Sequence, residues 1–161
     1  MVKGNTTRWL TRTAILLAVA LVFQLGSFPQ PVTGPVINLV LYLSALITGM
    51  VSGIIIGLFT PLVASLTGIL PAALAPMIPF IVLGNVVLVI IFSLLKEKNI
   101  FLAVGLAAVA KFMLLAGAVE FLVDVPPGVS RMMTFPQLLT ALGGGVLAVI
   151  VYKALQNNNL V

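Results

Sequence analysis

The feature that most constrains this chain is its run of long apolar segments, separated by only a few charges. Hydrophobic residues make up 61% of the 161 residues and charged residues 7%, whereas a soluble domain carries about 25% charged residues. A helix needs roughly 20 apolar residues to cross the hydrocarbon layer of a membrane, which leaves room for at most about six or seven crossings. We therefore predict an all-α integral membrane protein with a single transmembrane domain, residues 1–161.

Helix breakers divide this sequence into six expected transmembrane helices. The apolar stretch 36–70 would be more than about 50 Å long as one helix, so it must fold back near residues 48–52. Proline and glycine predict loops at 29–35, 68–79 and 124–133, and residues 96–99 form a polar turn. The expected helices cover about residues 11–26, 36–48, 52–67, 76–95, 100–123 and 134–155.

The positions of the cations predict the orientation in the membrane. Six of the eight basic residues fall on one side if the chain crosses six times: Lys3, Arg8, Arg12, Lys96, Lys98 and Lys153. Lys and Arg are enriched on the cytoplasmic side, so both termini are predicted to be cytoplasmic in a multi-pass protein of the cell (plasma) membrane. This topology accounts for the net charge of +5, and no nucleic-acid partner is expected.

One cation lies inside a predicted helix rather than at its end. A charge such as Lys111 at the centre of a membrane helix costs about 2.5 to 3.5 kcal/mol, so it should face a polar interior and marks a functional site by default. Counting from Pro76 puts Asn85 at nearly the same depth on the preceding helix, where the two could share a buried polar site. The alternative is a purely structural hydrogen bond between helices.

Other polar residues are predicted to gather at the outer end of the helices. This set comprises Gln24, Asn38, Glu120, Asp124, Arg131 and Gln137. Each alone is more often an interfacial anchor, but together they outline a mouth leading to Lys111. Glu120 lies nine residues beyond Lys111, about 13.5 Å along the axis and half a turn around it, so no direct pair between them is expected.

Small residues at four-residue spacing predict two flat helix faces. Gly49, Gly53 and Gly57 form a doubled GxxxG pattern, and Ala14 and Ala18 form a similar pair. Such faces let helix backbones approach closely. Packing within the chain is favoured for the glycines, with a partner contact as the alternative, whereas a partner protein is favoured for the alanines.

Several kinds of chemistry are disfavoured by the residues that the sequence lacks. Cysteine and histidine are absent and only three residues are acidic, so the usual ligands of zinc, copper and nickel are missing. The sequence contains no GxxxxGK[ST] phosphate-binding loop and no catalytic motif. We predict neither a metal nor a cofactor nor an enzyme activity, and any energy for transport should come from a partner.

These features together resemble those of a known family. The basic amino terminus leads into residues 14–18 (AILLA), the hairpin 48–53 reads TGMVSG, Gly84-Asn85 and Lys111-Phe112 follow, and residues 135–138 read FPQL. In order and spacing the chain resembles, over nearly its whole length, the S components of energy-coupling factor (ECF) importers. These are small six-helix membrane proteins that bind vitamins and related micronutrients.

The resemblance implies a division of labour between subunits. The S component would capture a small organic ligand from outside, and a transmembrane T subunit with two cytoplasmic ATPases would drive its reorientation. In that family the first-helix alanine motif faces the T subunit, which would place Ala14 and Ala18 at the partner surface. Metal-specific relatives use an amino-terminal histidine that this chain lacks, so an organic ligand is expected. Lys111 favours an anionic or carbonyl-bearing ligand, whose identity the sequence does not specify.

Two other functions remain open at this point. The chain could be a membrane assembly or scaffold protein without a ligand, in which Lys111 only satisfies a buried polar neighbour. It could also be a solitary small facilitator that works without ATPases. Only the first of these predicts that the protein has no ligand pocket.

Overall fold

The computed structural model describes residues 2–26 and 28–160, with side chains from Asn5 onward, so the side chain of Lys3 lies outside this part. The prediction of an all-α fold is confirmed, because the described residues form helices and no strands. The elements in chain order are α1 (Val2–Leu25), α2 (Gln30–Ile47), α3 (Met50–Leu66), the 3₁₀ helix η1 (Ala72–Met77), α4 (Ile78–Leu95), α5 (Ile100–Phe121), α6 (Pro127–Met132) and α7 (Phe135–Asn157).

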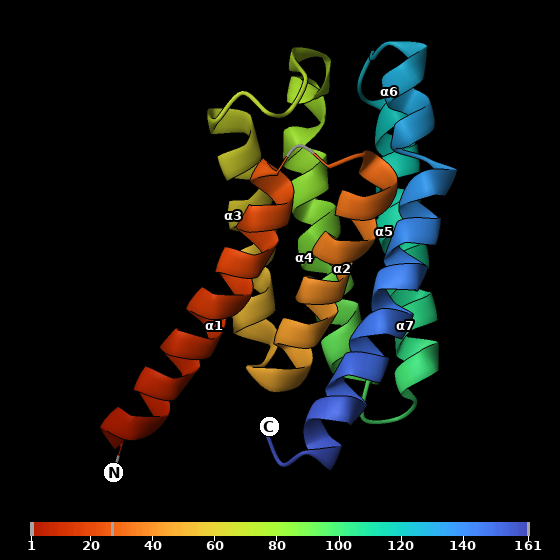
Figure 1. The fold of residues 1–161 in the computed structure, drawn as a ribbon. Helices are drawn as coiled ribbons and strands as arrows, with labels where there is room; N and C mark the ends of the chain where they lie inside the picture. The colour runs from red at the N-terminus through yellow and green to blue at the C-terminus, as the bar shows by residue number, and fades with distance from the viewer. Residues whose placement is uncertain (1, 27, 161) are drawn as a thin grey trace.

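The six long helices run up and down in one bundle (Figure 1). The start of α1, the end of α7 and the α2–α3 and α4–α5 turns lie at one end, which we call the turn end. The end of α1, the start of α2, η1 and α6 lie at the other, which we call the loop end. Helix α2 is central, with contacts to α1, α3, α4 and α7.

The helices have the length and composition of membrane spans. Among the described residues, five helical segments of at least 18 residues are apolar enough to cross a membrane. Helix α3 is a further apolar helix of 17 residues, which is at the lower limit of about 17 for a span. The chain is therefore a membrane protein with five such helices and a sixth of marginal length.

Helix α2 begins earlier than the proline-rich sequence predicts. The expected loop at 29–35 is wrong, because α2 starts at Gln30 and includes Pro31 and Pro35. Pro31 lies in the first turn, where its missing N–H would have no helical partner anyway. Pro35 removes one backbone bond inside the helix, and membrane helices tolerate this when neighbouring helices pack around the kink.

The other helix ends also differ from the expected ranges. Helix α1 extends back to Val2, because the polar residues before Thr11 continue the helix beyond the apolar stretch. The expected loop at 68–79 contains η1, and the expected loop at 124–133 contains α6. In both segments a proline stands directly before a short helix, Pro71 before η1 and Pro126 before α6.

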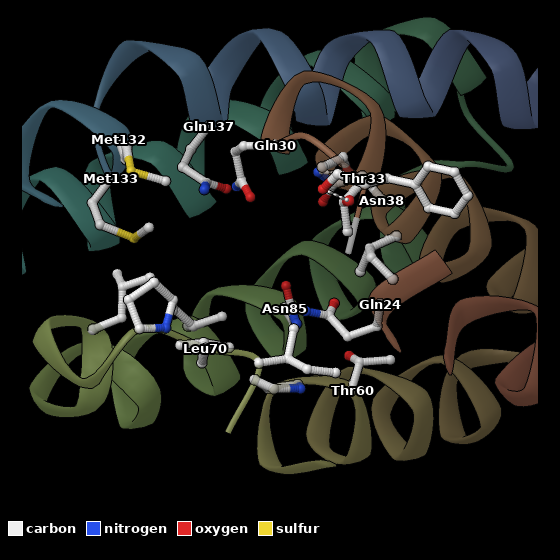
Figure 2. Close-up of a pocket in the computed structure, with 18 of the residues that line it drawn as sticks. Gln24, Gln30, Thr33, Asn38, Thr60, Leu70, Asn85, Met132, Met133 and Gln137 are labelled. Carbon is white, nitrogen blue, oxygen red and sulfur yellow. Dashed lines mark hydrogen bonds between the residues drawn. The ribbon is translucent and has the colours of Figure 1, made fainter. Parts of the chain in front are cut away.

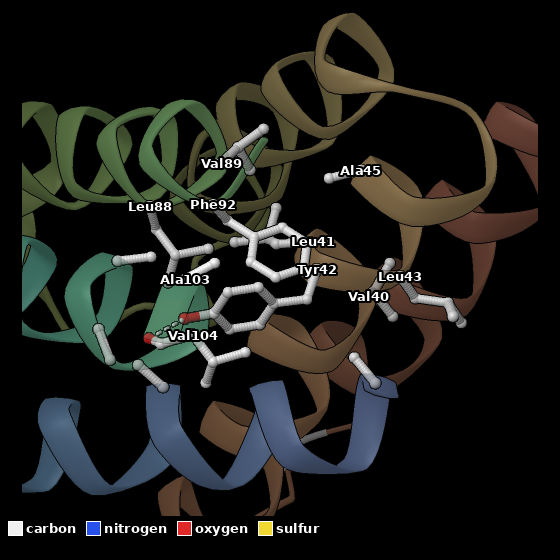
Figure 3. Close-up of a cluster of buried hydrophobic side chains, with 14 of the residues drawn as sticks. Val40, Leu41, Tyr42, Leu43, Ala45, Leu88, Val89, Phe92, Ala103 and Val104 are labelled. Atoms are coloured by element: carbon white, nitrogen blue, oxygen red, sulfur yellow. Dashed lines mark hydrogen bonds between the residues drawn. The ribbon is translucent and has the colours of Figure 1, made fainter. Parts of the chain in front are cut away.

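The turn end of the bundle is closed by a dense hydrophobic core (Figure 3). Tyr42 and Phe92 are fully buried and meet edge to face, with ring centroids 4.8 Å apart. The Tyr42 hydroxyl donates to the backbone oxygen of Val104 at 3.3 Å. The core therefore connects α2, α4 and α5 through both aromatic packing and a hydrogen bond.

Close approach between helices depends on glycines that lack a side chain. A Cβ added to Gly144 would lie 2.6 Å from the Pro35 oxygen and 2.8 Å from the Leu39 nitrogen, so α7 lies directly against the α2 backbone. A Cβ on Gly53 would lie 2.8 Å from Val89. Gly53 is buried within the chain, which is the packing that the sequence favours over the alternative of a partner contact.

Three other small residues of the predicted faces, Gly49, Ala14 and Ala18, are not buried between helices. Gly49 precedes α3 with a φ of 96°, a backbone conformation that glycine adopts without strain, and no atom lies within 4 Å of its added Cβ. Ala14 and Ala18 are exposed on α1. Their helix is joined to the bundle on its other side, where the Thr13 and Ser52 hydroxyls are 2.9 Å apart.

Candidate functional site

A cavity of about 360 Å³ opens at the loop end of the bundle (Figure 2). Its wall is built from α1, α2, α3, α4, α5 and α7, with residues of η1, α6 and the preceding loop segments. Its size falls within the range of about 300 to 1,000 Å³ that is typical of small-molecule sites. The cavity thus lies between all six long helices, on the side opposite the dense core.

Lys111 is a buried cation in the wall of this cavity. It lies midway along α5 and is 3% exposed. Its Nζ donates to Asn38 Oδ1 and to Asn85 Oδ1, each at 2.8 Å. The structure therefore brings Lys111 and Asn85 together at one depth, as the count along the helices predicted, and it joins α2, α4 and α5 at a single charged group.

Asn38 lies deeper than the sequence predicted. We expected it at the outer mouth because α2 was expected to begin at residue 36. Since α2 begins at Gln30, Asn38 is well inside the helix and reaches Lys111 instead. The predicted position of Asn38 was wrong for this reason.

Both asparagines are held in orientation by further hydrogen bonds. Asn38 Nδ2 donates to the Gly34 oxygen at 2.9 Å and to Thr140 Oγ1 at 3.4 Å. Asn85 Nδ2 donates to the Gly57 oxygen at 3.1 Å. With the amide nitrogens engaged in this way, both amide oxygens face Lys111.

The charge of Lys111 has no anionic partner among the described residues. Both of its acceptors are neutral amides. An ammonium group has three N–H donors, so one remains for a further acceptor. A buried charge is costly without a counter-charge, which makes the cavity beside Lys111 a favourable place for an anionic or carbonyl oxygen.

Three glutamine side chains also line the cavity, namely Gln24, Gln30 and Gln137. In the described part of the chain, their side-chain amides make no hydrogen bond to protein groups, although Gln137 is only 8% exposed. Figure 2 shows the amides of Gln30 and Gln137 reaching into the space from α2 and α7, and that of Gln24 from α1. Each amide offers both a donor and an acceptor to a bound molecule.

Three residues predicted for the mouth, Glu120, Asp124 and Arg131, do not line this cavity. Glu120 lies with Asp124 along a separate shallow depression at the end of α5, because it points half a turn away from Lys111. Arg131 is exposed on α6 and lines neither depression. Of the eight residues that the sequence predicts for the mouth and the buried polar site, the structure gathers Lys111, Asn85, Asn38, Gln24 and Gln137 around one cavity.

Sequence reasoning missed one face of α2. Gln30, Thr33, Gly34, Ile37 and Asn38 all line the cavity. They follow the spacing i, i+3, i+4, i+7, i+8 of a single helix face. This signal was present in the sequence but was hidden by the assignment of 29–35 to a loop.

The comparison with protein families identifies the chain. The family model for the substrate-specific component of ECF transporters matches residues 8–156. This chain belongs to that family. The matched range includes every residue that lines the cavity of this ECF substrate-specific component. No curated protein and no solved structure matches the chain.

Proposed function

We propose that this ECF substrate-specific component binds a vitamin or a related organic micronutrient in the cavity at the loop end. The observation that carries the proposal is Lys111, a buried cation that faces the cavity and has two neutral amides as its acceptors. Lys111, Asn38 and Asn85 would bind one end of the ligand. Gln24 and Gln137 would provide further polar contacts, whereas Glu120 and Arg131 lie away from the cavity and are not assigned to it.

We further propose that the protein works with a transmembrane T subunit and two cytoplasmic ATPases in the cell membrane. Family membership and the exposed Ala14 and Ala18 on α1 support this assignment. Small side chains on an exposed helix face allow another helix to lie close. The loop end would then face outward to collect the ligand, and the turn end, with its cations, would face the cytoplasm.

The binding proposal is tested by native mass spectrometry of the full chain purified from its host membrane. A small organic molecule released on denaturation is the expected result, and its mass identifies the substrate. A chain that carries no molecule and gains no thermal stability from any compound of a micronutrient panel would contradict the proposal and favour a scaffold protein.

The partner proposal is tested by a double substitution on α1. Ala14→Trp with Ala18→Trp should abolish co-purification of the T subunit and ATPases, because two indoles would hold a partner helix away, while ligand binding stays unchanged. The matched control is Leu102→Trp with Leu106→Trp, an exposed pair at the same spacing on α5. Equal recovery of the complex from both variants would remove the partner surface from α1.

A further inference from the structure

The charge, depth and composition of the cavity wall define a class of ligand. We infer that the ligand is an aliphatic monocarboxylate with an uncharged polar group at its other end. Lys111 binds its carboxylate, and Gln30 and Gln137 near the loop end bind its polar group. This inference rests on the proposed binding function and specifies its substrate.

The charge of the ligand follows from the charged groups in the cavity wall. Lys111 is the one charged residue among the described residues that line the cavity. A single carboxylate compensates this charge and accepts the third N–H of the ammonium group. A second anionic group would be left without a partner in a desolvated site, and a cation would meet Lys111 without any carboxylate to offset it.

The orientation of the ligand follows from two separate levels of polar side chains. Lys111, Asn38 and Asn85 meet near the middle of their helices. Gln30 and Gln137 lie in the first turns of α2 and α7. Gln30 and Asn38 are eight residues apart on α2, which is about 12 Å along the helix axis. A ligand that reaches both levels therefore has polar groups at its two ends.

The middle of the ligand follows from the apolar side chains of the cavity wall. Aliphatic and thioether groups line the space, including Leu70, Leu74, Ile81, Met132 and Met133. Phe28 is the one aromatic residue among the described lining residues, so a flat ring system would find no pair of aromatic faces to stack between. The wall therefore suits a flexible aliphatic chain.

Three matched probes test the inference on the full chain in lipid nanodiscs. They are N-acetyl-ε-aminocaproate, its primary amide, and the analogue in which an amine replaces the carboxylate. All three share the aliphatic chain and the neutral acetamide and differ in the charge at one end. Calorimetry should show that the acid binds about tenfold more tightly than the amide, because only the acid forms a charge-assisted bond to Lys111, and that the amine binds most weakly.

Two variants assign these differences to the proposed ends of the site. Lys111→Met should abolish the preference for the acid over the amide. Gln137→Leu should weaken both probes by a similar factor and leave the preference intact, because Gln137 contacts the uncharged end. The comparison of probes on the native chain stands by itself if the Lys111 variant does not fold.

Three results would overturn the inference. The first is that the amide or the amine binds as tightly as the acid or more tightly, and the second is that none of the three probes binds. The third is a cationic, dianionic or fused aromatic molecule released from the host-purified protein; in that case the proposed binding function stands and only the ligand class fails. A native chain that carries no molecule and binds neither the probes nor a micronutrient panel contradicts both.

Discussion

The two ends of the bundle use the same helices in different ways. At the turn end, Tyr42 and Phe92 fill the space between α2, α4 and α5 and neither is exposed. Toward the loop end the same three helices help to enclose a cavity, and they meet at Lys111 near the middle of α5. The packed end can hold the helices in place while the other end keeps a cavity with buried polar side chains. Such a cavity lowers the stability of the fold but allows a ligand to bind.

The largest expected effect is at the packed end. Phe92→Ala removes a fully buried ring that contacts Tyr42 and should lower the free energy of unfolding by about 3 to 5 kcal/mol. Unfolding by denaturant in mixed micelles measures this change. Phe59→Ala is the control, because Phe59 is 51% exposed, and its effect should be much smaller. Equal effects would show that the packed end does not dominate stability.

The second-largest loss of stability is expected at the contact between α2 and α7, where Gly144 lies against the α2 backbone. Gly144→Ala places a methyl group against the α2 backbone and should destabilise the protein by about 1 to 3 kcal/mol. The neighbouring Gly143 has no atom within 4 Å of an added Cβ, so Gly143→Ala should be neutral or slightly stabilising. If both variants unfold alike in the same denaturation assay, the close contact does not exist.

The smallest effect on stability is expected in the cavity. Gln137→Leu replaces an amide that has no side-chain partner among the described residues and should leave the free energy of unfolding nearly unchanged. The affinity for the host ligand should fall by about 0.5 to 1.5 kcal/mol, the net worth of a neutral hydrogen bond. Titration calorimetry measures the affinity, with the exposed Gln156→Leu at the far end of α7 as control. A loss of stability without a loss of affinity would assign Gln137 to structure.

How much could be predicted from the sequence differs between these two ends. Apolar length, helix breakers and the placement of cations were sufficient to predict an all-α membrane protein, because the lipid solvent leaves few alternatives. The pairing of Tyr42 with Phe92 was not predicted, since periodicity carries no information on which side chains meet across helices.

The site was predicted best where a polar or charged residue lies inside an otherwise apolar helix. Lys111 could be singled out because a cation in an apolar helix is costly, and Asn85 followed from counting depth. Asn38 and Gln30 were misplaced or missed, because local proline chemistry suggested a loop where tertiary packing allows a helix. Glu120 and Arg131 were grouped with the site by depth alone, which ignores the direction in which a helix presents each side chain.

The three-helix junction at Lys111 has a consequence for how the protein responds to its ligand. Because one ammonium group is bonded to α2 and α4 from α5, a molecule that occupies its remaining donor becomes part of the support between three helices. Occupancy and rigidity are then linked: the filled protein should resist heat and proteolysis better than the empty one. The T subunit proposed above as a partner would then be able to distinguish a loaded S component from an empty one by its rigidity, without touching the ligand.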